Sequence, residues 1–303
     1  MKLKRLLENP YRAFSALYNK GWFHGIPDET YIKLQFRAQM GKWPDLKNPQ
    51  TFNEKLQWLK LHDRNPLYTT LVDKYAVKKY VADIIGEEYI IPTLGVWDSF
   101  DEINFDDLPD QFVLKCTHDS GGLVICKDKS KLDLKVAKEK IEKSLQRDYY
   151  LYGREWPYKD VPRRIIAEQY MEDNHTKELM DYKFFAFNGE VKALFIATDR
   201  QKEKEDTKFD FFDTEYNHLD FTNGHPNAKV CPAKPVNFDK MKELACKLSK
   251  GIPHVRVDFY EVNGRIYFGE LTLSHWSGMV PFEPEKWDYI FGNWIKLSKN
   301  LNC

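Results

Sequence analysis

The stretch His254-Val-Arg-Val-Asp-Phe-Tyr-Glu-Val-Asn-Gly-Arg-Ile-Tyr-Phe-Gly-Glu-Leu-Thr272 contains two runs of β-branched and aromatic residues on either side of Asn263-Gly264. An Asn-Gly pair between two such runs is a strong signal for a β-hairpin. The register of the hairpin decides which side chains share a face, because successive residues of a strand point to opposite sides. The stretch therefore predicts a hairpin whose chemistry depends on its register.

Two registers are available to this hairpin. A two-residue Asn263-Gly264 turn pairs Asp258 with Gly269 and places Glu270 on the opposite face. A three-residue loop that begins at Val262 pairs Arg256 with Glu270 and Asp258 with Phe268. We favour the three-residue loop, because it separates apolar from polar side chains more cleanly. Its expected apolar face consists of Val255, Val257, Phe259, Tyr267 and Leu271, and its expected polar face of His254, Arg256, Asp258, Glu270 and Thr272.

The polar face of this hairpin carries two carboxylates, those of Asp258 and Glu270. Two carboxylates on adjacent strands repel each other unless a cation lies between them or one is protonated. A small set of hard oxygen ligands that leaves room for phosphate and water suits Mg²⁺. The alternative is a half-exposed hairpin in which Arg256 simply pairs with Glu270.

The composition points to a globular protein of two or three modest domains. The chain has 303 residues, of which 42% are hydrophobic and 15% aromatic. Its 46 basic and 46 acidic residues give a formal net charge of zero, so no overall field favours nucleic acid. The five cysteines have no paired spacing, and no secretory signal is present, so we expect a cytoplasmic protein with free thiols. No run approaches the ~18–20 apolar residues of a membrane span.

The predicted organisation is a helical segment over residues 1–70, the first part of a core over 71–110, a small lid over 111–168 and a large metal-binding unit over 169–303. In the first segment, Thr51-Phe-Asn-Glu54 reads as a capping box that opens a helix. The basic residues 1–26 have leucines at roughly helical spacing. We expect a helix packed on its own protein there, with contact to the inner face of a membrane as the alternative.

The later elements follow from hydrophobic pattern and turn residues. The expected helices cover 71–85, 134–146 and 236–250, and a final helix carries Trp287 and Trp294. The expected strands cover 112–115, 123–127, 164–170, 181–187 and 191–198, and residues 199–235 read as a long polar loop. The turn Thr117-His-Asp-Ser-Gly-Gly122 exposes backbone N–H groups that can bind phosphate, and Lys115 lies beside it. The fold class is therefore α+β.

The order of these motifs resembles the ATP-grasp superfamily. The succession is Asp73-Lys74, the Lys115 strand with its glycine turn, Ala167-Glu168-Gln-Tyr170, Lys183, Arg256-Val-Asp258 and Gly269-Glu270-Leu-Thr272. Three stretches are similar to the teichuronopeptide-biosynthesis-like (TupA-like) branch, which accompanies bacterial surface-polysaccharide genes: Thr-Phe-Asn-Glu-Lys-Leu-Gln-Trp-Leu (51–59), Asp-Lys-Tyr-Ala-Val (73–77) and Gly-Glu-Leu-Thr (269–272). The resemblance implies an ATP-grasp fold, with two α+β lobes gripping ATP and an N-terminal helical extension.

The resemblance also implies roles for individual residues. Lys74 and Lys115 would contact ATP phosphates while Gly121 and Gly122 close over them. Glu168, Gln169 and Tyr170 would form the hinge that reads adenine and ribose, and Lys183 would face the nucleotide. Asp258 and Glu270 would hold Mg²⁺, and Arg256 would steady the transferring phosphoryl group. The position of Thr272 is often Asn in the family, and Thr272 would supply a hydroxyl in its place.

Two histidines are further candidates. His118 lies in the glycine turn, within reach of an expected phosphate, and His275 follows the metal strand, near the expected place of a carboxylate substrate. For both, a structural hydrogen-bonding role is the favoured interpretation.

The implied activity is that of an ATP- and Mg²⁺-dependent carboxylate–amine ligase that works through an acyl phosphate. The acid would be a uronic acid of a surface polysaccharide such as a capsule or O-antigen, or of its precursor, and the amine an amino acid or other amine. One alternative is a glycosyltransferase, but the sequence has no Asp-x-Asp motif. A second is a non-catalytic nucleotide-binding protein.

Overall fold

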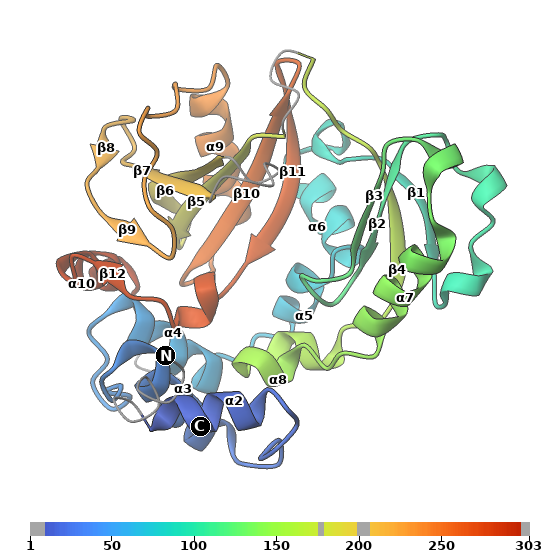
Figure 1. Ribbon diagram of the computed structural model, residues 1–303. Coiled ribbons are helices and arrows are strands. Elements are labelled where there is room, and N and C mark those ends of the chain that lie inside the picture. The colour runs from blue at the N-terminus through green and yellow to red at the C-terminus, as the bar shows by residue number, and fades with distance from the viewer. Residues whose placement is uncertain (1–9, 175–178, 199–206, 298–303) are drawn as a thin grey trace.

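The computed structural model describes residues 10–174, 179–198 and 207–297. Figure 1 shows two lobes, each built on an antiparallel sheet with helices against it, and a layer of N-terminal helices below the larger lobe. The α+β class with an N-terminal helical extension is confirmed.

The larger lobe contains a six-stranded sheet in the order β11-β10-β5-β6-β7-β8. Its strands are β5 (Asp181–Phe187), β6 (Glu190–Thr198), β7 (Lys208–Phe212), β8 (His218–Leu219), β10 (Val255–Val262) and β11 (Arg265–Thr272). One core cluster packs this sheet against α6 (Ala76–Ile85) and α9 (Phe238–Leu248). Another packs it against α4 (Phe52–His62) and α10 (Lys286–Trp294), so both faces of the sheet are buried. A two-stranded sheet of β9 (Thr222–Asn223) and β12 (Phe282–Glu283) lies beside α10.

The smaller lobe is a four-stranded sheet in the order β1-β4-β2-β3. Its strands are β1 (Thr93–Trp97), β2 (Phe112–Cys116), β3 (Leu123–Cys126) and β4 (Ile165–Gln169), and α7 (Leu134–Leu145) covers one face. The core of this lobe is separate from the cores of the larger lobe. Each sheet therefore has its own core.

The N-terminal layer contains α2 (Tyr11–Tyr18), α3 (Asp28–Met40) and the start of α4. The capping box predicted for α4 is confirmed: the Thr51 side chain accepts from the Glu54 backbone N–H, and the Glu54 side chain accepts from the Thr51 N–H. The final helix predicted to carry Trp287 and Trp294 is α10. Further short elements are α5 (Leu67–Val72), α8 (Tyr150–Gly153) and the 3-10 turns Glu87–Tyr89, Phe100–Glu102, Phe105–Asp107, Lys129–Lys131, Trp156–Asp160 and His275–Gly278.

The hairpin of β10 and β11 has a different register from the one we favoured. Val262 pairs with Arg265, so the turn has two residues, and both Asn263 (φ 50°) and Gly264 (φ 75°) are left-handed. A bulge at Gly269 then shifts the pairing, so that Asp258 lies opposite Glu270. The predicted three-residue loop was wrong. The bulge nevertheless places Asp258 and Glu270 on the same face of the hairpin, as the three-residue loop was expected to do.

The bulge also changes which residues form the apolar face. Tyr267 pairs with Tyr260 and is only half-buried, whereas Ile266 and Phe268 are buried in the core with Phe259. The prediction that Tyr267 lies on the apolar face was therefore wrong. It assumed a turn of three residues, one more than the structure has.

Three further expectations need correction. The helix expected over 71–85 is two helices, α5 and α6, because residues 73–75 break it. The stretch expected as a loop over 199–235 contains β7, β8 and β9 in its described part, and residues 199–206 lie outside the described residues. The strand β1 was not foreseen, although it pairs with β4.

The expected absence of membrane spans can be checked on the described helices, and none of them is long and apolar enough to cross a bilayer. Residues 1–9 of the basic N-terminal stretch lie outside the described residues, so contact with a membrane through residues 1–26 stays a prediction.

Candidate nucleotide and metal site

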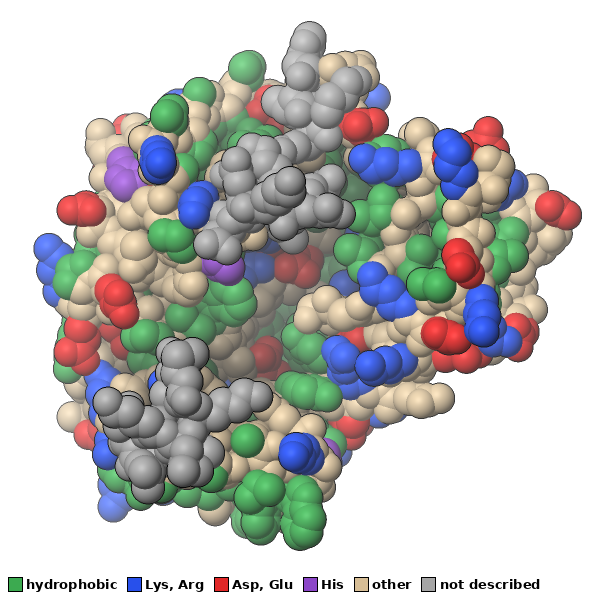
Figure 2. All heavy atoms as spheres, in the orientation of Figure 1, with side chains coloured by type: hydrophobic (Ala, Val, Ile, Leu, Met, Phe, Trp, Pro, Cys, Tyr) green, Lys and Arg blue, Asp and Glu red, His purple; other side chains and the backbone are tan. Residues whose placement is uncertain are grey.

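A cleft lies between the two lobes, and it brings together side chains from several separate parts of the chain. Figure 2 shows this hollow, with acidic and basic side chains inside it. Its lining residues are Lys74, Lys78, Ile90, Ile91, Lys115, Asp119, Ser120, Gly122, Leu123, Glu168, Asp181, Lys183, Tyr260, Phe268, Gly269 and Glu270.

Two lysines of the cleft hold one buried carboxylate. Lys115 of β2 and Lys78 of α6 each place their Nζ 2.5 Å from a different oxygen of Glu168 on β4. Burial alone would raise the pKa of Glu168, but Lys115 and Lys78 lower it below its usual value. The carboxylate is therefore ionised, and it fixes both ammonium groups at the edge of the cleft.

Lys74 lies in the break between α5 and α6. Its backbone N–H donates to the carbonyl of Thr117, and its Nζ donates to the carbonyl of Asp119. The preceding Asp73 accepts from the backbone N–H groups of Tyr75 and Ala76 and so caps α6. Burial lowers the pKa of Lys74, and the carboxylate of Glu270 partly opposes this. Lys74 thus connects the break between α5 and α6 to the glycine turn through two hydrogen bonds.

The glycine turn is closed by its own side chains. Gly122 donates its N–H to Asp119 Oδ1, and Ser144 of α7 donates to the other carboxylate oxygen of Asp119. A Cβ on Gly122 would lie 2.4 Å from Ser144 Oγ and 2.6 Å from Cys116 Sγ. Gly122 is required by this packing, and its N–H points to Asp119 in the present conformation.

The opposite wall of the cleft is the polar face of the β10–β11 hairpin. Arg256 donates from Nε to Asp258 Oδ1 and from Nη2 to Asp258 Oδ2, both at 2.7 Å, and also from Nη2 to Glu270 Oε1 at 2.8 Å. Lys183 of β5 donates to Asp258 Oδ2 and pairs with Asp181 at 2.8 Å. The Arg256 guanidinium therefore lies between the two carboxylates and supplies the cation that two neighbouring carboxylates need.

Glu270 and Asp258 differ in exposure. The Asp258 side chain is 1% exposed and the Glu270 side chain 43% exposed, so Glu270 is the carboxylate that faces the cleft. Burial raises the pKa of Glu270, but Lys183, Arg256 and Lys74 outweigh it and hold the pKa at about 2. Thr272 Oγ1 lies 3.3 Å from the same Glu270 oxygen.

A buried hydrogen-bond chain supports Arg256 from behind. Arg256 Nη1 donates to His275 Nδ1 at 2.9 Å, and His275 Nε2 lies 2.9 Å from Asn223 Oδ1. Burial, together with the charge of Arg256, holds the pKa of His275 well below its usual value. The imidazole is therefore neutral, with its proton on Nε2. His275 orients Arg256, whereas His118 bonds the Arg147 carbonyl and does not line the cleft.

The cleft continues into a more apolar pocket at the hinge between the lobes. Gln169 at the end of β4 and the following Tyr170 and Met171 line it, together with Val113, Ile125, Leu179 and Ala197. Five residues, Ile91, Lys115, Leu123, Glu168 and Tyr260, line both spaces. A flat apolar group can therefore lie in the hinge pocket while attached charged groups reach Lys115.

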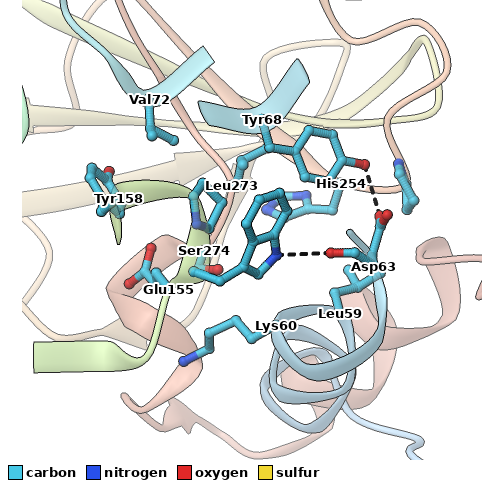
Figure 3. A pocket seen from close by; sticks show the side chains of 13 residues that line it. Leu59, Lys60, Asp63, Tyr68, Val72, Glu155, Tyr158, His254, Leu273 and Ser274 are labelled. Carbon is cyan, nitrogen blue, oxygen red and sulfur yellow. Dashed lines mark hydrogen bonds between the residues drawn. The ribbon is translucent and has the colours of Figure 1, made fainter. Parts of the chain in front are cut away.

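A second pocket lies where β11 ends (Figure 3). Leu273 and Ser274, directly after Thr272, line it with aromatic side chains and with Lys60 and Glu155. Trp156 Nε1 and the Tyr68 hydroxyl both donate to Asp63, each at 2.8 Å. Burial lowers the pKa of Lys60 to about 8 and raises that of Glu155. The pocket combines a polar floor with aromatic walls next to the hairpin.

The structure gathers most of the residues singled out in the sequence. Lys74, Lys115, Gly122, Glu168, Lys183 and Glu270 line the cleft, Gln169 and Tyr170 line the adjoining hinge pocket, and Arg256 and Asp258 lie directly behind Glu270. Sequence reasoning missed Lys78 and Asp181. Lys78 follows Lys74 by four residues, and this helical spacing could have indicated that both lysines point the same way. No pattern in the sequence indicated that Asp181 would line the cleft.

The donor set fits Mg²⁺ only together with further oxygen ligands. Asp258 and Glu270 offer hard oxygens, but Arg256 and Lys183 already neutralise much of their charge. With Lys74, Lys78 and Lys115 also present, the cleft is rich in cations and favours a polyanion that brings phosphate oxygens with it.

A family model described as "TupA-like ATPgrasp" matches residues 54–296. Among solved structures, the ATP-grasp ligase PsnB with a minimal precursor has 9% identity and a TM-score of 0.41, over 69% of this chain and 54% of that chain. D-alanine–D-alanine ligase from Helicobacter pylori has 15% identity and a TM-score of 0.43, over 81% and 69%. The Bacillus anthracis D-alanine–D-alanine ligase with ATP has 15% identity and a TM-score of 0.38, over 67% and 54%. The chain thus spans about half the length of two of these ligases. No curated protein sequence matches.

Proposed function

The chain belongs to the TupA-like ATP-grasp family, and from this premise we propose that it is an ATP- and Mg²⁺-dependent carboxylate–amine ligase. In the proposed reaction the γ-phosphoryl group of ATP passes to a carboxylate oxygen of the acid, leaving ADP and an acyl phosphate. An amine then attacks the acyl carbon, and inorganic phosphate and a proton leave as the amide forms. The single observation that carries the proposal is the cleft in which Lys74, Lys115 and Glu270 meet.

The nucleotide would lie across both connected spaces of the cleft. Its adenine would occupy the hinge pocket beside Gln169 and Tyr170, where apolar side chains offer a surface for a flat ring. Its phosphates would replace the Asp119 carbonyl as partners of Lys74 and would lie next to Lys115. Gly121 and Gly122 would close over the phosphates once the turn rearranges.

Glu270 and Asp258 would hold Mg²⁺, with Thr272 contributing its hydroxyl. Mg²⁺ supplies charge neutralisation between phosphate oxygens in such reactions. Arg256 is held by His275 and Asn223, so it can contact a transferring phosphoryl group without first being ordered. Lys183 would face the same group from β5.

The substrate is inferred from the family alone. By that analogy the acid is a uronic acid of a surface polysaccharide or its precursor, and the amine is an amino acid or other amine. The protein would then act in the cytoplasm, with residues 1–26 as a contact to the inner face of the membrane.

The test is ADP release measured with purified protein, Mg-ATP and panels of uronic acids and amines. We expect ADP to appear only when an acid is present, and hydroxylamine to capture the acyl phosphate as a hydroxamate. Turnover of sugar nucleotides without ADP would favour the glycosyltransferase alternative. ATP binding without either reaction would favour a non-catalytic nucleotide-binding protein.

A further inference from the structure

A second cluster of metal-binding side chains lies on the large lobe, at the edge of the sheet away from the β10–β11 hairpin. It consists of Asp210 on β7, His218 on β8 and Cys231 in the run that leads to α9, and their ligand atoms all lie within 4.8 Å of one another. Among the described residues it is the one group of three His, Cys, Asp or Glu side chains gathered this closely. The three residues lie within 21 positions of one another in sequence, and the fold of this segment brings their side chains together.

We propose that Asp210, His218 and Cys231 form a zinc site. Carboxylate, imidazole and thiolate are the three kinds of protein ligand that Zn²⁺ accepts, and a water molecule completes the tetrahedron. The thiolate and imidazole select Zn²⁺ over Mg²⁺, which prefers oxygen ligands only. This separates the proposed zinc site from the hairpin carboxylates of the nucleotide cleft.

The positions of the three ligands support simultaneous binding. His218 Nε2 lies 3.3 Å from Asp210 Oδ1, a separation that two ligands of one metal ion can have. Asp210 is buried, and its two oxygens accept from the N–H of Ala228, each at 3.2 Å, which fixes the carboxylate. Such support of a ligand by a neighbouring N–H group is typical of metal sites. His218 and Cys231 are exposed, so an ion can enter from solvent.

The charges also balance with a divalent cation. Asp210 and an ionised Cys231 carry two negative charges, which Zn²⁺ neutralises, and the Cys231 thiol proton is released to solvent on binding. Without a cation, ionising Cys231 beside a buried carboxylate is unfavourable. His218 would bind as the neutral imidazole through Nε2.

The expected effect of the ion is to fasten a weakly held segment to the sheet edge. The run that contains Cys231 has no regular structure, and Val230 and Val236 in it are 82% and 93% exposed. Its other described attachments include hydrogen bonds from the Tyr216 hydroxyl to the carbonyls of Pro232 and Ala233. β8 has only two residues. A metal bound to all three ligands would join β7, β8 and this run.

The test uses Co²⁺ as a spectroscopic substitute for Zn²⁺ on the whole protein under reducing conditions. We expect one Co²⁺ per chain, a near-ultraviolet thiolate-to-cobalt band, and displacement of Co²⁺ by Zn²⁺ but not by excess Mg²⁺. Cys231→Ser should abolish the thiolate band, and His218→Gln should weaken Zn²⁺ binding by more than about 10-fold, since even supporting residues contribute that much. Cys246→Ser, at a partly exposed cysteine on α9, is the matched control and should keep the band.

Thermal unfolding supplies a second measurement. Stoichiometric Zn²⁺ should raise the Tm of the wild type and of Cys246→Ser but not that of Cys231→Ser. The proposal is overturned if the wild type shows no thiolate band, or if the band survives in Cys231→Ser. It is also overturned if His218→Gln binds Zn²⁺ as tightly as the wild type.

Discussion

In the proposed reaction, some residues of the cleft would contact bound ATP, and the charge of others would matter as the phosphoryl group leaves. Lys115 belongs to the first kind, since its ammonium already lies at the edge of the cleft, paired with Glu168. Glu270 belongs to the second, because it is the hairpin carboxylate that faces the cleft and it stays ionised with a pKa of about 2. Substitutions at these two positions should therefore separate binding from catalysis.

We predict that Glu270→Gln binds ATP but forms ADP about 10²–10³-fold more slowly, the usual cost of losing one well-placed electrostatic group. Lys115→Ala should weaken ATP binding as well as turnover. Calorimetry would give the nucleotide affinity, and acid-dependent ADP release the rate. Lys79→Ala, at an exposed lysine on α6 that pairs with Asp83, is the control and should leave both unchanged. Near-normal turnover of Glu270→Gln at saturating Mg²⁺ would show that the metal assignment is wrong.

At the scale of elements, the contact between α10 and α4 holds the C-terminal helix on the large lobe. Gly292 of α10 lies against the chain that enters α4: a Cβ on Gly292 would be 2.3 Å from the Gln50 carbonyl oxygen and 2.8 Å from the Phe52 nitrogen. Those atoms belong to the backbone next to the capping box, so they cannot give way as a flexible side chain would.

Gly292→Ala should therefore destabilise the protein by about 1–3 kcal/mol, the range typical of overpacking. Helix propensity alone predicts the opposite sign, because Ala stabilises a helix interior by about 1 kcal/mol relative to Gly. Urea unfolding would measure the difference. Gly25→Ala is the control, since a Cβ there meets nothing within 4 Å, and it should change stability little. A neutral or stabilising effect of Gly292→Ala would refute this account of the helix contact.

At the scale of the whole molecule, the two lobes have separate cores, and the cleft lies between them. We predicted that residues of about 111–168 form a mobile lid, which must open to admit ATP and close to exclude water from an acyl phosphate. The Gly122 N–H donates to Asp119, so in the proposed complex the glycine turn would have to rearrange before this N–H could reach phosphate.

Hydrogen exchange should therefore slow across β2, the glycine turn and β3 when Mg-ATP is added at saturation. Strand β7 serves as the internal control, because it is separated from β10 by two other strands and should not respond. Unchanged protection across residues 112–126 would count against the lid.

The stability of the whole fold should also depend on pH through a buried histidine. His254 is 2% exposed, and burial lowers its pKa from 6.5 to about 3. Between these values the unfolded chain binds one more proton than the folded chain at this site. Stability contributed by the neutral His254 is therefore complete above pH 6.5 and is lost as pH falls toward 3.

The variant His254→Phe should flatten this dependence, because Phe cannot take up a proton and the site is already surrounded by phenylalanine rings. The slope of unfolding free energy near pH 5 should fall by about 1.4 kcal/mol per pH unit, the value for one proton. Urea titrations at several pH values would measure both slopes. An identical slope in the variant would mean that His254 is not the titrating group.

Local sequence determined most of the elements in this protein. The capping box at Thr51, the place of the hairpin around Asn263-Gly264 and the strands around Lys115 and Glu168 were all predicted, because short-range steric and hydrogen-bonding preferences select them. The family motifs likewise pointed to the residues that gather in the cleft.

Only the tertiary structure decided the register and the partners. The bulge at Gly269 brings Glu270 opposite Asp258, and no local pattern predicted this bulge. A single extra residue in one strand reverses which side chains share a face. The break at Lys74 depends on Arg164, 90 residues later in sequence, which pairs with the adjoining Asp73 at 2.9 Å. The cluster of Asp210, His218 and Cys231 arises in the same way. Such contacts follow from the packing of whole sheets and helices and not from local preference alone.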